Sequence, residues 1–260
     1  MPADTRARTE RLAWREAPAG AMLYDAARIE APGPALFDPS SYGAAAQPVA
    51  AGGRQAAWFV AMPGWQGVLR GYRRGVATPG WQGVLRGYRC GGLAARVSRD
   101  AYVWQGEART RGLREYRLLA HMREQGLAVP APLAAGYWRH GLTYRAAILV
   151  ERIPAARPLA SLLDEPAWEA VARAIAAMHR AGVWHADLNA FNILLDPAGL
   201  AWLIDFDRGT AGGVSERGRQ GNLARLRRSL VKVGGERGQA FWQRLEPAYR
   251  AAWARGTARA

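Results

Sequence analysis

The stretch HADLNAFNILLDPAGLAWLIDFD occupies residues 185–207, and it decides how the second half of the chain is interpreted. It places Asp187, Asn192 and Asp205 at fixed spacing, each beside apolar residues. The segments ILLD and LAWLI are typical of two short strands joined by a turn at PAG. Such a hairpin would return Asp205 to the loop that carries Asp187 and Asn192.

These three residue types match the needs of phosphoryl transfer. One carboxylate faces an acceptor hydroxyl and takes its proton, while an amide and a second carboxylate hold Mg²⁺ against the phosphates of ATP. We therefore predict Asp187 as the catalytic residue, Asn192 and Asp205 as metal ligands, and ATP and Mg²⁺ as cofactors. An Asp and an Asn at this spacing are weak evidence alone, and a histidine such as His185 is more often a packed structural residue. The prediction rests on the conjunction of helix, loop, strand, turn and strand.

The surrounding periodicity predicts an α+β fold in two lobes. Residues 168–182 have an apolar stripe at helical spacing, end at a glycine and lead directly into His185. Further helices are predicted over 107–125, 222–230 and 240–253, and strands at 21–29, 56–61, 129–138 and 143–153. We place the boundary after Ile153: residues 1–153 form a small strand-rich lobe with one helix, and residues 154–260 form a helical lobe.

A direct repeat interrupts the strand-rich lobe. PGWQGVLRGYR occupies residues 63–73 and again 79–89, with no difference between the copies. This identity indicates a recent duplication or a sequence artefact, because an old repeat architecture would contain several diverged copies. The repeat also duplicates one candidate site residue, as Arg70 and Arg86.

The motif series resembles the lipopolysaccharide kinase superfamily. The segments VLRGYR, REYRLLA, GLAVPAP, YRAAILVERI, HADLNAFNILLD, LIDFDRG and NLARLRRS follow the order of that family's blocks over about residues 20–250. The resemblance implies a protein-kinase-like fold. It also implies transfer of the ATP γ-phosphate to the 4-hydroxyl of 3-deoxy-D-manno-octulosonic acid (Kdo) on a lipid A precursor. Such a protein is expected at the cytoplasmic side of the inner membrane, as a peripheral partner of its surface.

The strand-rich lobe of a kinase supplies a cation to the α- and β-phosphates, normally a lysine. The sole lysine is Lys232, so an arginine must serve here. Arg70 and Arg86 remain alternatives, with Arg86 slightly favoured. Glu115 is the predicted ion-pair partner of that arginine, although most glutamates are solvated helix charges.

Three more features of the site are predicted. The backbone from Glu151 to Ile153 is the candidate hinge that would bind adenine. Residues 51–59 could cover the phosphates, although a plain turn fits them nearly as well. Arg225, Arg227 and Arg228 either meet phosphates of the lipid or form a solvated basic face.

The loop departs from the protein-kinase pattern at several positions. Ala186 stands where regulated protein kinases have arginine, and Asn189 replaces their lysine, which favours a sugar acceptor over a protein. Asp207 follows Phe206 in place of glycine, and its role is open. Alternatives are therefore a heptose or other small-molecule kinase of the same superfamily, and a kinase-like protein inactivated by the duplication.

Composition limits the partners and the compartment that we expect for this protein. The formal net charge is +15, which reflects either an Arg-rich codon bias or an anionic partner. We find no nucleic-acid module and expect no nucleic-acid partner. One cysteine, Cys90, excludes an internal disulfide and fits a reducing cytoplasm. We predict neither a signal peptide nor a transmembrane helix.

Overall fold

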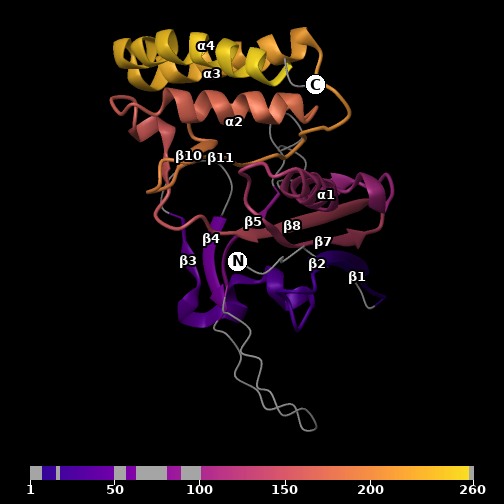
Figure 1. Ribbon diagram of the computed structural model, residues 1–260. Helices are drawn as coiled ribbons and strands as arrows, with labels where there is room; N and C mark the ends of the chain where they lie inside the picture. Colours follow the sequence, from indigo (N-terminus) through magenta and orange to yellow (C-terminus); the bar gives the residue numbers. More distant parts are fainter. Residues whose placement is uncertain (1–7, 16–17, 50–56, 63–80, 89–100, 258–260) are drawn as a thin grey trace, which may run out of the picture. The chain divides into compact units, whose positions relative to one another are not determined.

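The protein is seen here as a computed structural model that describes residues 8–15, 18–49, 57–62, 81–88 and 101–257. The chain divides into two compact units, Met1–Tyr116 with Ala131–Arg152 and Arg117–Pro130 with Ile153–Ala260. The main sheet lies in the first unit, and three long helices lie in the second (Figure 1). This arrangement confirms the predicted α+β class.

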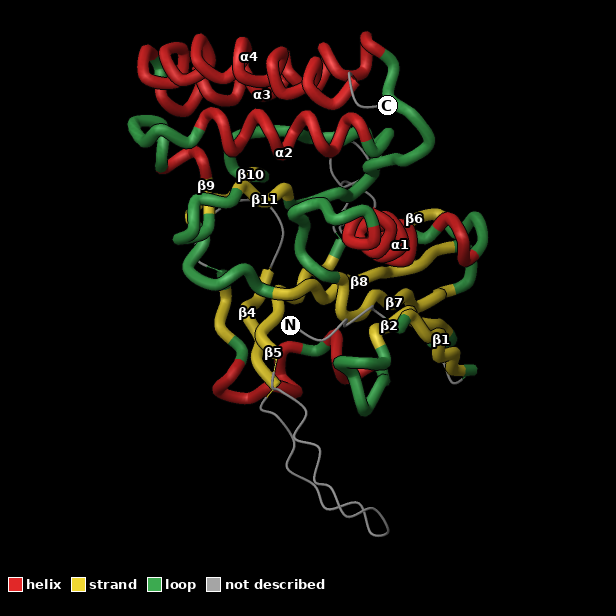
Figure 2. Tube along the Cα trace, in the orientation of Figure 1, coloured by secondary structure: helices red, strands yellow, loops and turns green. Residues whose placement is uncertain are grey.

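An antiparallel sheet forms the first unit, shown in yellow in Figure 2. Its strands lie in the order β1-β2-β7-β8-β5-β4-β3, and β6 pairs with β8. The strands are β1 (Thr9–Trp14), β2 (Gly20–Asp25), β3 (Gln47–Pro48), β4 (Ala57–Met62), β5 (Trp81–Gly87), β6 (Tyr102–Val103), β7 (Pro132–His140) and β8 (Thr143–Glu151). Because β5 pairs with β4 on one side and with β8 on the other, it is an interior strand of the sheet.

One side of this sheet packs against two short 3-10 helices, η1 (Pro34–Phe37) and η2 (Pro39–Ala45). Leu36 and Tyr42 of these helices share a buried cluster with Leu85 and Leu149 of the sheet. Complete burial of a leucine such as Leu149 contributes about 1.5–3 kcal/mol. A third 3-10 helix, η4 (Glu107–Arg109), precedes the helix α1 (Arg111–Glu124).

The N-terminal strands differ from the prediction. The strand expected over 21–29 ends at Asp25, because the Asp25 carboxylate accepts the N–H groups of Arg8 and Ala27 and turns the chain. The sequence does not predict strand β1. It alternates only between exposed and half-buried positions at the sheet edge, so its sequence lacks a clear apolar period.

Three helices dominate the second unit: α2 (Trp168–Arg180), α3 (Glu216–Gly234) and α4 (Glu236–Thr257). Figure 1 shows α3 and α4 lying side by side with α2 along them. The remaining elements are η5 (Leu159–Ser161), β9 (Arg157–Pro158), β10 (Ile193–Leu195) and β11 (Ala201–Leu203). The short strands form a second sheet in the order β11-β10-β9.

The helix predicted over 168–182 is α2. Its stripe of Val171, Ile175 and Met178 is fully buried, and Gly182 ends it with a φ of +71°. The other two predictions identified only the middles of α3 and α4. The two helices approach closely near their junction, where a Cβ at Gly238 would collide with the carbonyl oxygen of Leu230.

The two units do not follow a single cut in the sequence. The main break falls after Arg152, one residue before the boundary that the sequence indicated. Residues 117–130, expected in the strand-rich lobe, group with the helical unit. A hydrogen bond from Leu203 N–H to the Ala128 carbonyl (3.0 Å) joins this segment to β11. Among the described residues, no helix is both long and apolar enough to cross a bilayer.

Candidate functional site

The loop after α2 is closed at its base by a short backbone bridge. Trp184 N–H donates to Thr210 O (2.8 Å), and Thr210 N–H donates to Trp184 O (3.1 Å). This bridge brackets residues 185–209, so the chain leaves α2 and returns to the same place. The predicted catalytic and metal-binding residues all lie inside this closed segment.

His185 joins the two halves of the segment. Its ring is fully buried and lies 4.6 Å from the Phe206 ring, between centroids. The Nδ1 atom lies 3.0 Å from Asp187 N, whose N–H donates to it, and Nε2 lies 3.0 Å from the Ile204 carbonyl. These partners fix a neutral ring with the proton on Nε2. Burial lowers the pKa of His185. The expected structural role of His185 is confirmed, because both ring nitrogens are already engaged.

Asp187 presents its carboxylate to solvent, with the side chain 54% exposed. Asn189 Nδ2 donates to Asp187 Oδ2 at 3.1 Å, and Arg225 lies 3.5 Å from Oδ1. The Asp187 backbone carbonyl accepts from Asn192 Nδ2 at 2.9 Å. The carboxylate is therefore oriented from two sides and still accessible to an acceptor hydroxyl.

Asn189 organises the turn of this loop. Its Oδ1 atom accepts the N–H groups of Phe191 (2.8 Å) and Asn192 (3.1 Å), while its Nδ2 atom holds Asp187. This is the local side-chain-to-backbone bonding that asparagine favours in turns. In the sequence, Asn189 stands out only as a departure from the protein-kinase lysine. Its geometry shows that it links the catalytic and metal-binding positions.

The hairpin after the loop brings Asp205 back, as predicted. Strands β10 and β11 pair with Ile193 opposite Leu203, and Ile204 N–H donates to the Asn192 carbonyl at 3.0 Å. Asp205 therefore directly follows Ile204, the residue that is hydrogen-bonded to Asn192. Its φ is +63°, a left-handed conformation uncommon for a residue with a side chain and frequent at functional sites.

The donors in this segment suit a hard cation. Because Asn192 uses its amide nitrogen to hold Asp187 O, its Oδ1 atom is the end that could bind a cation. With the Asp205 carboxylate this gives oxygen ligands, which Mg²⁺ prefers together with water and phosphate oxygens. Among the described residues, no group of three or more His, Cys, Asp or Glu could hold a metal alone. The residues fit a metal shared with ATP phosphates.

Helix α3 supports the loop at three points that the sequence did not reveal. Asn222 Nδ2 donates to His185 O (2.6 Å), Asn222 Oδ1 accepts from His185 N–H (3.3 Å), and Ser229 Oγ accepts from Ala190 N–H (3.1 Å). Arg225 lies between these two positions and reaches Asp187. Residues 222, 225 and 229 share one face of a helix, so this spacing was the signal that could have identified them.

A buried polar chain continues behind Asn222. His179 of α2 places Nε2 3.1 Å from Asn222 Oδ1 and Nδ1 2.8 Å from the Tyr249 hydroxyl of α4. Burial lowers the pKa of His179 to about 4, since the charged ring would lose its hydration. A neutral His179 can donate to Asn222 and accept from Tyr249. These buried hydrogen bonds join α2, α3 and α4 beneath the loop.

In the first unit the structure brings Arg86 and Glu115 together. The Nη2 atom of Arg86 lies 2.6 and 2.7 Å from the two carboxylate oxygens of Glu115, whose side chain is only 2% exposed. The Tyr88 hydroxyl donates to Glu115 Oε2 at 2.5 Å. The predicted ion pair is confirmed, and the use of Arg86 for phosphate binding stays a prediction. Arg70 and residues 51–56 lie outside the described residues.

The candidate hinge, residues 151–153, already has some of its backbone N–H groups in hydrogen bonds to the sheet. Glu151 N–H donates to Ala131 O and Arg152 N–H donates to Gln82 O, at 2.8 and 2.9 Å, and the Glu151 carboxylate pairs with Arg28. Their N–H groups are therefore committed to the sheet. Ile153 has no hydrogen bond within the described part of the chain, so its backbone is the segment's best candidate for adenine.

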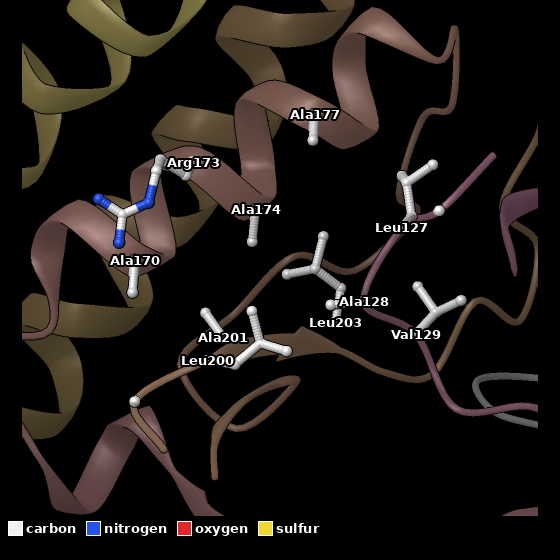
Figure 3. Close-up of a pocket in the computed structure, with 12 residues that line it drawn as sticks. Leu127, Ala128, Val129, Ala170, Arg173, Ala174, Ala177, Leu200, Ala201 and Leu203 are labelled. Atoms are coloured by element: carbon white, nitrogen blue, oxygen red, sulfur yellow. The ribbon is translucent and has the colours of Figure 1, made fainter. Parts of the chain in front are cut away.

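The second unit also contains an apolar recess of about 220 Å³. Figure 3 shows alanines of α2 above it, Leu200 and Leu203 below, and Leu127 and Val129 at one side. No predicted site residue of this unit lines it, and Arg173 is its one charged member. The chemistry of the site therefore lies in the loop and not in this recess.

Comparisons with known proteins agree with the geometry. A sequence profile of the lipopolysaccharide kinase (Kdo/WaaP) family matches residues 45–249. The chain is 46% identical over 245 residues to a 3-deoxy-D-manno-octulosonic acid kinase of Xanthomonas campestris pv. campestris, over 91% of this chain and 92% of that protein. It is 46% identical over 246 residues to the protein of that name in Stenotrophomonas maltophilia, over 92% of each chain. The Xylella fastidiosa protein is 45% identical over 245 residues, 91% and 92% of the two chains.

Proposed function

This chain belongs to the lipopolysaccharide kinase (Kdo/WaaP) family and is a phosphotransferase, and we propose that it phosphorylates Kdo on a lipid A precursor. One observation carries the proposal: 46% identity across nine-tenths of both chains to proteins named for this reaction. The accessible Asp187 in a fixed loop supports the same chemistry. We place the transfer at the 4-hydroxyl of Kdo, as the motif resemblance implies.

Asp187 acts on the acceptor. Its exposed carboxylate takes the proton of the acceptor hydroxyl as the hydroxyl oxygen bonds to the γ-phosphorus of ATP and the bond to ADP breaks. Asn189 and His185 fix the backbone and carboxylate of Asp187 before the acceptor arrives. Such a preformed geometry lowers the entropic part of the barrier.

Asn192 and Asp205 would hold the magnesium ion that the donor set fits. When bound with ATP, that ion neutralises phosphate charge and orients the transferred group. Arg86 would meet the α- and β-phosphates, with its guanidinium held by Glu115, whose carboxylate also accepts from the Tyr88 hydroxyl. Ile153 would bind adenine through its backbone, while the Glu151 N–H remains bonded to Ala131.

The acceptor implies a membrane surface. Lipid A precursors are anionic lipids, so we propose a peripheral position at the cytoplasmic side of the inner membrane. The net charge of +15 supports attraction to such a surface. Sedimentation with vesicles containing anionic lipid, compared with neutral vesicles, tests this proposal, and equal binding to both would contradict it.

The reaction itself is tested with Kdo-lipid IVA, ATP and Mg²⁺. We expect a product with one added phosphate by mass spectrometry, and phosphorus–proton correlation at position 4 of Kdo by NMR. Asp187→Asn should fold normally and lower turnover about 10²- to 10⁴-fold, because the loop keeps its bonds but loses its base. Asp164→Asn, another exposed carboxylate of the same unit, is the control and should keep full turnover.

Two results would count against the proposal. Transfer to a heptose acceptor and none to Kdo would assign the chain to another reaction of the same superfamily. Absence of both transfer and an ATP-dependent thermal shift would indicate a kinase-like protein without activity.

A further inference from the structure

Arg225 of α3 is placed beside the predicted catalytic carboxylate. Its Nη1 atom lies 3.5 Å from Asp187 Oδ1, and the two side chains are 44% and 54% exposed. Among the cationic side chains that the structure describes, Arg225 is the one that pairs with Asp187. A positive group therefore stands where the acceptor must approach.

The contact contributes little to the fold. An exposed ion pair stabilises a protein by about 0–1 kcal/mol, and this one is long. The loop is already held without it, by His185, by Asn189, by the two bonds of Asn222 and by Ser229. Structural support does not account for an arginine at this position.

The helix nevertheless fixes where the guanidinium can reach. Arg225 lies between two residues of α3 that hold the loop, and its neighbour Leu226 is fully buried. The backbone beneath Arg225 is therefore rigid, while its side chain is long enough to change partner. An acceptor with its own anionic group would find a preset cation beside the catalytic carboxylate.

We propose that Arg225 binds the carboxylate of the sugar-acid acceptor and so sets which hydroxyl faces Asp187. The inference rests on the proposed function, because it concerns an acceptor that is an acid. A guanidinium binds a carboxylate through two parallel N–H···O bonds, which fixes orientation as well as position. On binding, the acceptor carboxylate replaces Asp187 as the partner of Arg225.

The test compares two acceptors that differ in one charge: Kdo-lipid IVA and its carboxyl methyl ester. The wild-type enzyme should prefer the acid by about 10- to 100-fold in kcat/KM, the usual value of a hydrogen-bonded charge. Arg225→Gln should lose most of this preference, with equal rates on acid and ester within about threefold. Arg225→Lys should keep part of it, because the charge remains without the fork.

Arg250→Gln is the matched control. Arg250 is an exposed arginine of α4, and it also pairs with a carboxylate, that of Glu246. This variant should keep the wild-type preference for the acid. Thermal melting of all variants should match wild type, because each substituted side chain is exposed.

Three outcomes would overturn the inference. The first is an Arg225→Gln enzyme with the full preference for the acid. The second is an Arg225→Gln enzyme whose loss of rate disappears on an acceptor that lacks the lipid A phosphates. That result would assign the Arg225 guanidinium to a phosphate of the lipid instead of the sugar carboxylate. The third is a wild-type enzyme that phosphorylates neither acceptor, which removes the proposed function as well; in the first two cases wild-type transfer to Kdo still stands.

Discussion

At the scale of single residues, the pairing of Arg86 with Glu115 could be predicted because the segments VLRGYR and REYRLLA resemble two of the family's blocks. The lack of a lysine before Lys232 left an arginine for the phosphate-binding position. What the sequence left open was the choice between Arg70 and Arg86. The described sheet contains Arg86, which occupies β5 opposite Ile148 of β8.

Arg86→Lys tests the phosphate-binding role. Lysine keeps a cation beside the buried Glu115, so the fold should survive, but it lacks the planar fork that binds two oxygens. We expect the KM for ATP to rise about 10-fold, a cost typical of one charged hydrogen bond. Steady-state kinetics with varied ATP measure this effect.

Arg70→Lys is the informative comparison, because the two arginines have identical flanking sequences. We expect the smaller change in KM from this variant. A larger change than that of Arg86→Lys would assign phosphate binding to the first copy.

His179 predicts how stability depends on pH. Its pKa in the folded state is about 4, below the ordinary 6.5, so between these values the unfolded chain binds more protons than the folded one. Stability is therefore complete above pH 6.5 and falls as the pH drops toward 4. The loss is on the order of 3 kcal/mol for this residue. Urea unfolding at pH 7 and pH 5 should show about 2 kcal/mol of this loss, because pH 5 lies between the two pKa values.

His179→Gln removes the titrating ring and serves as the comparison. It should be less stable than wild type at pH 7, because Asn222 and Tyr249 lose their partner. Its stability should depend less on pH between 7 and 5. Buried His185, with its lowered pKa, contributes in the same direction in both proteins. An unchanged pH slope in the variant would show that His179 is not the group responsible.

At the scale of elements, α3 is the helix whose role in the structure differs most from the role that the sequence suggests. In the sequence, its arginines suggest a basic surface. The structure shows that this face carries Asn222 and Ser229, which hold His185 and Ala190. Local periodicity predicts that a helix exists, but it does not reveal which distant loop the helix will support.

Asn222→Ala tests the support that α3 gives the loop. It leaves the backbone groups of His185 and one ring nitrogen of His179 without partners in a buried place, which costs about 1–3 kcal/mol. The loop should shift, and kcat should fall by about 10- to 100-fold with little change in the KM for ATP. Chemical denaturation and steady-state kinetics check the two effects.

Gln220→Ala is the control for this prediction. Gln220 lies on α3 but is exposed, so its removal should change stability by less than about 0.5 kcal/mol. Loss of stability in Asn222→Ala without loss of kcat would show that α3 supports the fold and not the catalytic geometry.

At the scale of the whole molecule, the second copy of the repeat supplies β5, the strand that pairs with β4. β4 pairs with the second copy, with Met62 directly opposite Trp81. Removal of residues 63–78 would leave Pro79 and Gly80 between them, a two-residue connection that begins with the φ near −65° imposed by proline. The junction would then have the same sequence that follows Met62 in the present chain.

We therefore expect the variant without residues 63–78 to fold and to transfer phosphate at the wild-type rate. Shortening the connection lowers the entropy cost of closing it by roughly 2 kcal/mol or less. Its melting temperature should be equal to or higher than that of the full chain. A variant that binds ATP more weakly would show that the first copy contributes to the site.

The sequence alone determined the reaction class and the local elements around it. The spacing of Asp187, Asn192 and Asp205 and the stripe of α2 are encoded within short stretches, where periodicity and turn residues suffice. Only the tertiary structure showed that residues 81–87 of the second copy pair with β4 and β8, because identical sequences have identical local preferences. It also decided that Asn222 holds His185, a contact between residues 37 apart. Such contacts depend on how separate elements pack, which no local pattern specifies.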